Sequence, residues 1–500
     1  GVTSNGDTLF CGSVGEPTDG TLINAISFVR VYYSSFNTFK NLNGNGGAAY
    51  INIPSQPTID KTASIQFYHS VFMNCIAQNG GAIYLESADE GRLFDFYQCD
   101  FNDNGHVFMS TDNIAAAGGA IYIKSSVSSF KFANCLFAFN YATDGAGIYY
   151  FSDAADTNTD RSTPLIQMND CNFYYNLMYN SGGAMSIIIT KNPSPRVVEI
   201  NNCNFIDNKY ENDDDKTSDA PESGGAIYYS FEYQSTDSSA SQTDTYLHIV
   251  DSFFQRNYAT IYGGAICILI NGPDKLVEIE KCSFNFNFVR FSGSGEDSGL
   301  YGKGGAIYYL NSKASQTDNT NPSLNVHDCN FTNCFAADQG GSISIVVSNA
   351  QSSRPIKINN CLFDDNEEYS SMSSGTKFES ELTKNGLFVS YVIESEKDSP
   401  SNNNPPLQIS GCDFKQTIDR FDSSSEAEKG GCIYLSVNNC QQTGSIAIDH
   451  CTFSHKKSSA AESYGGSIYY LSNAATESAS SKEVLSITNS VFEGSNVLNY

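Results

Sequence analysis

Cys99-Asp-Phe-Asn-Asp-Asn104 and Gly118-Gly-Ala-Ile-Tyr122 are two short stretches that recur, in this order, along nearly the whole chain. The first has the pattern Cys-x-Phe-x-x-Asn, and the second is a Gly-Gly pair followed by small and apolar residues. About thirteen units carry the first pattern, which makes the chain a repeat protein. Its aromatic residue recurs at Phe36, Phe72, Phe101, Phe137, Phe173, Phe205, Phe254, Phe284, Phe331, Phe363, Phe414, Phe453 and Phe492.

Within a unit, apolar and polar residues alternate over short runs, as in Ile356-Lys-Ile358 and Leu485-Ser-Ile487. A period of two is typical of a strand with one buried side. Gly-Gly pairs and Asn-Asp or Asn-Asn dipeptides separate the strands, and these residues accept the positive φ of sharp corners. The pattern therefore predicts an all-β parallel solenoid, in which each rung stacks on the preceding one. Where successive copies of the phrases are farther apart in the sequence, we expect loops inserted at fixed corners.

Two columns of small polar residues are expected inside the stack. Because Ser252 and Ser490 replace Cys in one column, a small filler explains that column better than a disulfide framework or a metal ladder does. The fifteen Cys are an odd number, so at least one thiol is free or paired between chains, and partial oxidation between neighbouring rungs stays open. We expect the Asn column to bond the corner backbone and the next rung. The columns comprise Cys99, Cys135, Cys171, Cys203, Cys282, Cys329, Cys361, Cys412 and Cys451, and Asn104, Asn140, Asn176, Asn208, Asn257, Asn287 and Asn366.

The alternation of Gly-Gly-Ala-Ile with Phe-x-x-Asn resembles the polymorphic outer membrane protein repeats of chlamydial surface adhesins and of protist surface-protein families. The resemblance covers roughly residues 28 to 495. It implies a right-handed parallel β-helix of the pectin-lyase type and a role in surface adhesion. We expect residues 1–27 to be a lead-in or a preceding rung, and residues 28–500 to be one β-helix domain within a longer chain.

The formal net charge of −27 points away from nucleic acid, which binds to basic surfaces, and from direct docking to anionic lipid. No apolar run approaches the length of a membrane span, so no direct membrane insertion of this segment is expected. An acidic, polar surface agrees with an extracellular or cell-surface location. The expected partner is a host or self surface protein or glycan, with self-assembly as a further option.

The fifth position of the Gly-Gly phrase supplies the candidate binding surface. If the Ile before it faces inward, the Tyr faces outward, and a ladder of phenol rings offers contact area to a sugar or a protein. A second interpretation is that inserted loops shield these rings and that Tyr pairs stabilise the sheet. A third inverts the register, with Ala and Tyr inside. The candidate residues are Tyr84, Tyr122, Tyr149, Tyr228, Tyr308, Tyr434 and Tyr469.

An enzyme is the alternative, because β-helices of this type also include pectate lyases and polygalacturonases. These chemistries need clustered acids, with Arg or Lys as the base in a lyase. Only Asp251, Lys281 and Asp328 on successive rungs suggest such a cluster, and a cross-rung salt bridge explains them better than a catalytic site does.

The sequence gives similarly weak signals for metal sites. The loop Glu211–Asp215 could bind Ca²⁺ or simply be solvated, and the six His show no spacing of Zn²⁺ ligands. We therefore expect neither a metal nor a cofactor. The sequence favours a non-enzymatic adhesin or structural scaffold over a polysaccharide lyase or hydrolase.

Overall fold

The computed structural model divides the chain into two compact units, an N-terminal unit of Gly1–Phe253 and a C-terminal unit of Phe254–Tyr500. The loop Glu211–Asp215 and Asn366 lie outside the residues that the structure describes. The described residues are 2–4, 29–42, 44–53, 64–105, 115–153, 163–190, 196–210, 223–232, 245–272, 276–289, 302–312, 322–336, 339–348, 354–364, 388–394, 407–416, 428–429, 432–440, 446–455, 463–464, 467–474 and 485–493.

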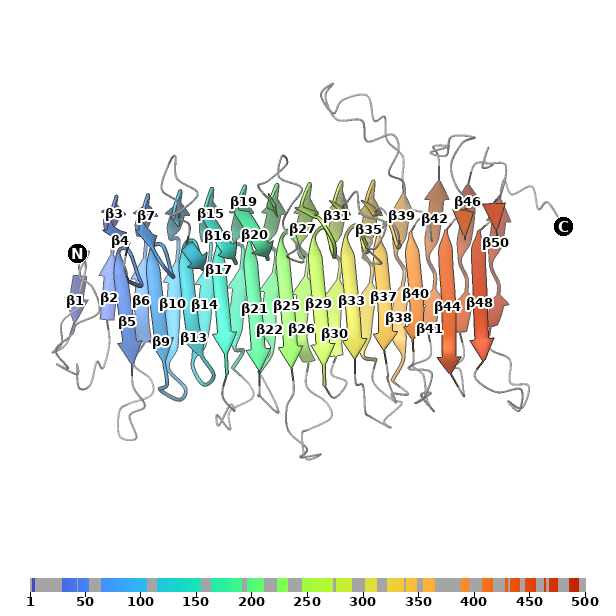
Figure 1. Ribbon diagram of the computed structural model, residues 1–500, viewed down its shortest axis with the longest axis horizontal. Coiled ribbons are helices and arrows are strands. Elements are labelled where there is room, and N and C mark those ends of the chain that lie inside the picture. Colours follow the sequence, from blue (N-terminus) through green and yellow to red (C-terminus); the bar gives the residue numbers. More distant parts are fainter. Residues whose placement is uncertain are drawn as a thin grey trace, which may run out of the picture. The chain divides into compact units, whose positions relative to one another are not determined.

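Each coil of the N-terminal unit runs through face 1, face 2, a short strand and face 3 (Figure 1). Face 1 contains β2 (Val29–Tyr32), β6 (Ser64–Tyr68), β10 (Leu93–Tyr97), β14 (Ser129–Ala133), β18 (Ile166–Asn169), β22 (Val198–Asn201) and β26 (Thr245–Val250). Face 2 contains β3 (Ser35–Asn37), β7 (Val71–Met73), β11 (Asp100–Asn102), β15 (Leu136–Ala138), β19 (Asn172–Tyr174) and β23 (Asn204–Ile206). The short strands are β4 (Lys40–Asn41), β8 (Ile76–Ala77), β12 (Ala115–Ala117), β16 (Tyr141–Asp144), β20 (Leu177–Ser181) and β24 (Lys209–Tyr210). Face 3 contains β5 (Ala49–Ile53), β9 (Ile83–Ser87), β13 (Ile121–Ser125), β17 (Ile148–Ser152), β21 (Met185–Thr190) and β25 (Ile227–Glu232).

The C-terminal unit repeats the same order of strands. Its face 1 contains β30 (Leu276–Glu280), β34 (Leu324–His327), β38 (Ile356–Asn359), β41 (Leu407–Ser410), β45 (Ile446–Asp449) and β49 (Leu485–Thr488). Face 2 contains β27 (Phe253–Gln255, at the boundary between the units), β31 (Ser283–Asn285), β35 (Asn330–Thr332), β39 (Leu362–Asp364), β42 (Asp413–Gln416), β46 (Thr452–His455) and β50 (Val491–Glu493). The short strands are β28 (Tyr258–Ala259), β32 (Phe288–Val289), β36 (Phe335–Ala336), β43 (Glu428–Lys429) and β47 (Ser463–Tyr464). Face 3 contains β29 (Ile266–Asn271), β33 (Ile307–Ser312), β37 (Ile343–Ser348), β40 (Val389–Glu394), β44 (Ile433–Cys440) and β48 (Ile468–Ala474).

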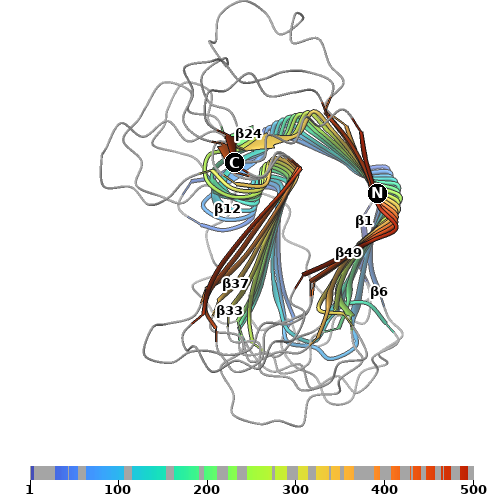
Figure 2. The ribbon, with the colours of Figure 1, turned by 90° about the vertical axis from the view of Figure 1, so that its right-hand side faces the viewer.

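Neighbouring coils pair in parallel and in register, so that Phe101 lies opposite Phe137 and Ile121 opposite Ile148. Within each unit the strands of one face superimpose when viewed along the stack (Figure 2). Every described element is a strand or an irregular connection, which confirms the expected parallel β-helix. Among the described strands, β1 (Val2–Ser4) departs from parallel pairing, because it pairs antiparallel with β2. Nothing in the described part forms an apolar helix long enough to cross a membrane.

The corners of each coil are fixed by residues with positive φ. Gly118, the first Gly of its phrase, has a φ of 66°, and Asn134, just before Cys135, has a φ of 53°. These positions confirm the expectation for Gly and Asn. Bulkier residues also occupy corners: Lys281, at the corner equivalent to Asn134, has a φ of 52°, and Phe139, at a further corner just before Asn140, has a φ of 53°.

The Phe of the first repeat pattern fills the core beneath face 2. Phe101, Phe137 and Phe173 are fully buried, and neighbouring rings stack with centroids 4.9 and 4.7 Å apart. The same stacking continues in the C-terminal unit, where the Phe284 and Phe331 rings are 4.8 Å apart. Because each buried Phe contributes about 1.5–3 kcal/mol from burial, this column is a main source of stability.

The Asn column is buried and hydrogen-bonded between coils, as expected. Asn104 Nδ2 donates to the Phe72 carbonyl of the preceding coil at 3.0 Å and to Asn140 Oδ1 of the next coil at 3.0 Å. Its backbone amide donates to the same Oδ1 at 3.1 Å. Each Asn therefore satisfies polar groups of three coils.

The Cys column acts as a hydrogen-bonded filler, which agrees with its replacement by Ser. Cys329 Sγ accepts the backbone amide of Cys282 at 3.4 Å and donates to the His327 carbonyl at 3.2 Å. In the N-terminal unit, Ser252 Oγ makes the equivalent bonds to the Cys203 amide at 3.1 Å and the Val250 carbonyl at 2.9 Å. The thirteen Cys whose side chains the structure describes are buried with free thiols.

Three buried arginines just before strands of face 1 were missed in the sequence analysis. The guanidinium of Arg92 binds Asp89, with Nε 2.8 Å from Oδ2. In another coil, Arg196 donates to Ser129 Oγ at 2.6 Å and to the Ser128 carbonyl at 2.7 Å. Arg354 is equally buried. These side chains close the core where face 3 leads into face 1.

Candidate functional site

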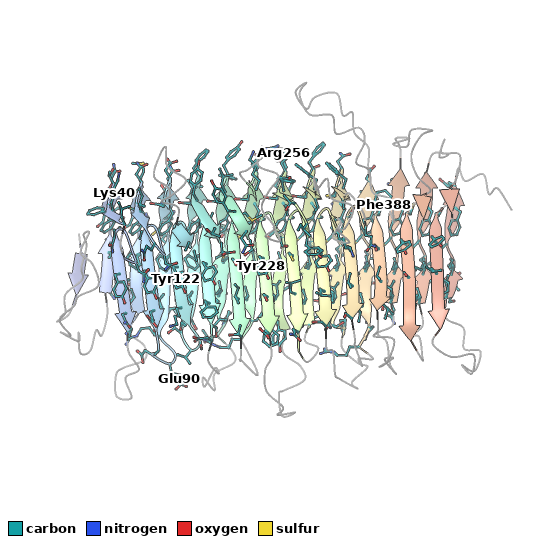
Figure 3. All side chains as sticks on the ribbon, viewed as in Figure 1. Lys40, Glu90, Tyr122, Tyr228, Arg256 and Phe388 are labelled. Carbon is teal, nitrogen blue, oxygen red and sulfur yellow. The ribbon has the colours of Figure 1, made fainter. Side chains whose placement is uncertain are left out.

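The Tyr column lies on the outer side of face 3, where Figure 3 labels Tyr122 and Tyr228. Ile121 and Ile148, one residue before Tyr122 and Tyr149, are fully buried, because successive residues of a strand point to opposite sides. The interpretation with Ile inside and Tyr outside is therefore right, and the inverted register is wrong.

In the N-terminal unit, four of these rings form one continuous stack. The centroids of Tyr50, Tyr84, Tyr122 and Tyr149 follow each other at 5.2, 4.9 and 5.1 Å, with ring planes within 22° of parallel. Each ring thus covers the face of its neighbour, so the stack presents ring edges and hydroxyl groups to the outside. This corrects the expectation of a platform for stacking sugar rings, because the flat faces within the stack are already occupied.

The column is also less exposed than a bare ladder. Tyr84, Tyr308 and Tyr434 are buried, with 7, 4 and 8% of their surface exposed. Four further tyrosines are half-buried: Tyr122, Tyr149, Tyr228 and Tyr469. The second interpretation expected shielding by inserted loops and pairing between coils. The rings are partly shielded and paired between coils, whereas most residues of the inserted loops lie outside the described part of the chain.

One source of shielding is the residue that precedes each Gly-Gly phrase. Tyr262, just before Gly263, packs its ring on Tyr308 with centroids 4.4 Å apart. In the N-terminal unit, Ser181 Oγ lies 3.4 Å from Ser186 Oγ, which replaces Tyr in the column. The positive φ of the first Gly folds the preceding residue back toward the column.

Burial keeps the phenols of Tyr84 and Tyr149 neutral by raising the pKa of each. Burial, with a smaller contribution from Glu86, raises the pKa of Tyr84, and burial with the nearby Asp144 raises the pKa of Tyr149. Neutral phenols both donate and accept hydrogen bonds. The Tyr column can therefore bind polar groups such as sugar hydroxyls or backbone amides along a line of fixed spacing.

Exposed aromatic pairs at the corners were missed in the sequence analysis. Phe139 and Tyr175, each 43% exposed, stack with ring centroids 5.2 Å apart. Tyr33, 77% exposed, stacks on His69 at 4.7 Å. The signal was present, since Phe139 and Tyr175 occupy the last variable position of Cys-x-Phe-x-x-Asn in consecutive coils.

The residues proposed for the alternative enzyme occupy corners and are engaged in local interactions. Lys281 Nζ lies 3.0 Å from Glu280 Oε1, and Asp328 Oδ2 lies 2.9 Å from His327 Nδ1. The hydrogen bond from His327 and a weaker one from Asn360 lower the pKa of Asp328 below its usual range. Asp251 is at the equivalent corner of the N-terminal unit, with a φ of 49°.

In comparisons with known proteins, no family model matches the chain, and no curated protein or solved structure matches it significantly.

Proposed function

We propose that this chain is a non-enzymatic extracellular or cell-surface β-helix that acts in adhesion or as a structural scaffold of a surface assembly. The observation that carries the proposal is the stack of Tyr50, Tyr84, Tyr122 and Tyr149, which repeats one hydrogen-bonding group at intervals of about 5 Å. Serial display on a rigid scaffold suits recognition of an extended partner better than it suits catalysis, which uses a residue once.

The partner chemistry follows from charge and from the exposed groups. A net charge of −27 disfavours nucleic acid and anionic membranes. Phenol edges beside Asp144 favour a hydroxyl- or amine-bearing glycan, or the surface of a host or self protein. The resemblance to surface-adhesin repeats leads to the same class of partner.

The test measures retention of the protein on immobilised mannan, dextran and chitosan and on fixed epithelial cells. The variant Tyr122→Ser/Tyr149→Ser removes two neighbouring phenols, and its fold should persist because Ser186 and Ser344 occupy the same column naturally. The matched control is Tyr174→Ser, a half-buried tyrosine on face 2. We expect the double variant to be retained about tenfold less, or weaker still, than the parent and the control. A tenfold decrease corresponds to a loss of about 1.4 kcal/mol of binding free energy. Equal retention of all three proteins, or none, contradicts the proposal.

A further inference from the structure

In the C-terminal unit, three potential metal ligands from different parts of the sequence meet on the outer side of face 1. Glu278 and Glu280 are two residues apart on β30 and point the same way, and His327 on β34 pairs with Glu280. His327 Nε2 lies 3.5 Å from Glu278 Oε1 and 3.3 Å from Glu280 Oε2. Among the described residues, this is the one group of three such side chains with all ligand atoms within 4.8 Å.

The imidazole of His327 is oriented as in a metal site. Its Nδ1 lies 2.9 Å from Asp328 Oδ2, and because an ionised carboxylate only accepts hydrogen bonds, Nδ1 carries the proton. In the neutral ring the Nε2 lone pair then faces the two glutamates. A ligating His that donates its other N–H to a carboxylate is the usual arrangement behind a metal ion. Asn360 Nδ2 in turn donates to Asp328 Oδ1 at 3.3 Å.

The glutamates are held as well. Asn325 Nδ2 donates to Glu278 Oε1 at 3.0 Å, and Lys281 binds Glu280 through Oε1. Glu280 Oε2 therefore remains directed at His327. All three candidate ligands are half-buried, which limits competition from solvent.

The distances suit a small divalent ion. The His327 to Glu280 distance exceeds the roughly 2.7–2.9 Å of a charge-assisted hydrogen bond. Zn²⁺ bonds of about 2.0–2.2 Å to nitrogen and oxygen place tetrahedral ligands about 3.4 Å apart, between the two measured separations. We propose that Glu278, Glu280 and His327 bind Zn²⁺ or a first-row divalent ion of similar preference, with Asp328 as the positioning residue. The fourth coordination position faces outward and would accept water or a group of a bound partner.

The proposal differs from the sequence-based expectation of no metal, and it does not depend on the proposed adhesion function. It is tested by calorimetric titration of Zn²⁺ into the full chain after treatment with EDTA. The parent should bind one ion, and Asp328→Asn, which tolerates the positive φ of this corner, should weaken binding about 10- to 100-fold. His327→Gln should weaken binding further.

The matched control is His450→Gln. His450 also contacts a neighbouring aspartate, with Nδ1 2.7 Å from Asp449 Oδ2, but it is not part of a three-ligand cluster among the described residues. Its substitution should leave the affinity unchanged. Equal affinity of the parent and His327→Gln would overturn the proposal, as would the absence of saturable binding by the parent.

The cysteines require a separate readout, because a thiol site would also bind Zn²⁺. With Co²⁺ in place of Zn²⁺, a nitrogen and oxygen site should give only weak visible bands that disappear in His327→Gln. An intense sulfur-to-cobalt charge-transfer band in the near ultraviolet would place the ion on cysteines and overturn the assignment. Thermal unfolding with and without Zn²⁺ should show a higher midpoint with the ion for the parent and for His450→Gln, because the ion binds only the folded coils.

Discussion

Asn140 and Asn176, 36 positions apart in the sequence, are joined by a 2.9 Å hydrogen bond from the Nδ2 of Asn140 to the Oδ1 of Asn176. Asn140 Nδ2 also donates to the Phe101 carbonyl at 3.0 Å, and its Oδ1 accepts from the Asn104 amide. One side chain thus connects its own coil to the coils before and after it.

Asn140→Ala should therefore be strongly destabilising. Each buried polar group left without a partner costs about 1–3 kcal/mol, and the substitution removes partners from at least two of them. Asn102→Ala, at the half-buried end of strand β11, should change the free energy of unfolding by less than about 0.5 kcal/mol. Urea unfolding followed by circular dichroism measures the free energy of unfolding of both variants. Similar losses of stability in the two variants would refute the proposed stabilising role of the Asn column.

Cys412 should tolerate Ser but not Val. Its Sγ accepts the Cys361 amide at 3.5 Å and donates to the Ser410 carbonyl at 3.4 Å, and Ser can make both bonds. We expect Cys412→Ser to cost less than about 1 kcal/mol and Cys412→Val to cost about 1–3 kcal/mol, although Val is apolar and close in size. The reverse order in urea unfolding would mean that the column is purely an apolar filler.

The stability of the fold should fall in alkaline solution. Burial raises the pKa of the Cys75 thiol from its ordinary 9.0 to about 11, so the folded state favours the protonated form. This contribution is complete below pH 9 and is lost as the pH rises through 11, with a slope of about 1.4 kcal/mol per pH unit. Cys75→Ser, which does not titrate, should reduce the slope by up to that amount between pH 9 and 11. An unchanged slope would show that this thiol ionises equally in the folded and unfolded states.

Gly118→Ala should destabilise the fold for two reasons. The φ of 66° is unfavourable for a residue with a Cβ by about 1–2 kcal/mol, and that Cβ would also meet the Ile121 carbonyl oxygen. Gly118→Asn separates the causes, because Asn accepts positive φ but has the same Cβ. Thermal unfolding should show both variants impaired, whereas full rescue by Asn would leave backbone conformation as the only cause.

The sequence was most informative where a residue type repeats. The Phe, Cys and Asn columns and the inward Ile of face 3 follow from periodicity, because a stack of coils places equivalent positions on top of one another. The exposure of the Tyr column did not follow. It depends on the residue before Gly-Gly, for example Tyr262 against Tyr308, and that position varies between coils.

Features that occur once were missed. Arg196 is buried because it bonds to Ser128 and Ser129 of another coil, and no repeat pattern marks it. His327 meets Glu280 only because 46 intervening residues return the chain to the neighbouring strand, so no local spacing indicates the cluster. Single residues brought together by stacking need coordinates to be recognised.

The most direct test of the account is incubation of the protein with soluble acidic and neutral polysaccharides, followed by measurement of polysaccharide chain length. A non-enzymatic scaffold leaves every chain at its original length, whether the chain is retained or not. Shortened chains would contradict the account and direct attention to Lys281, Asp328 and their neighbours as catalytic groups.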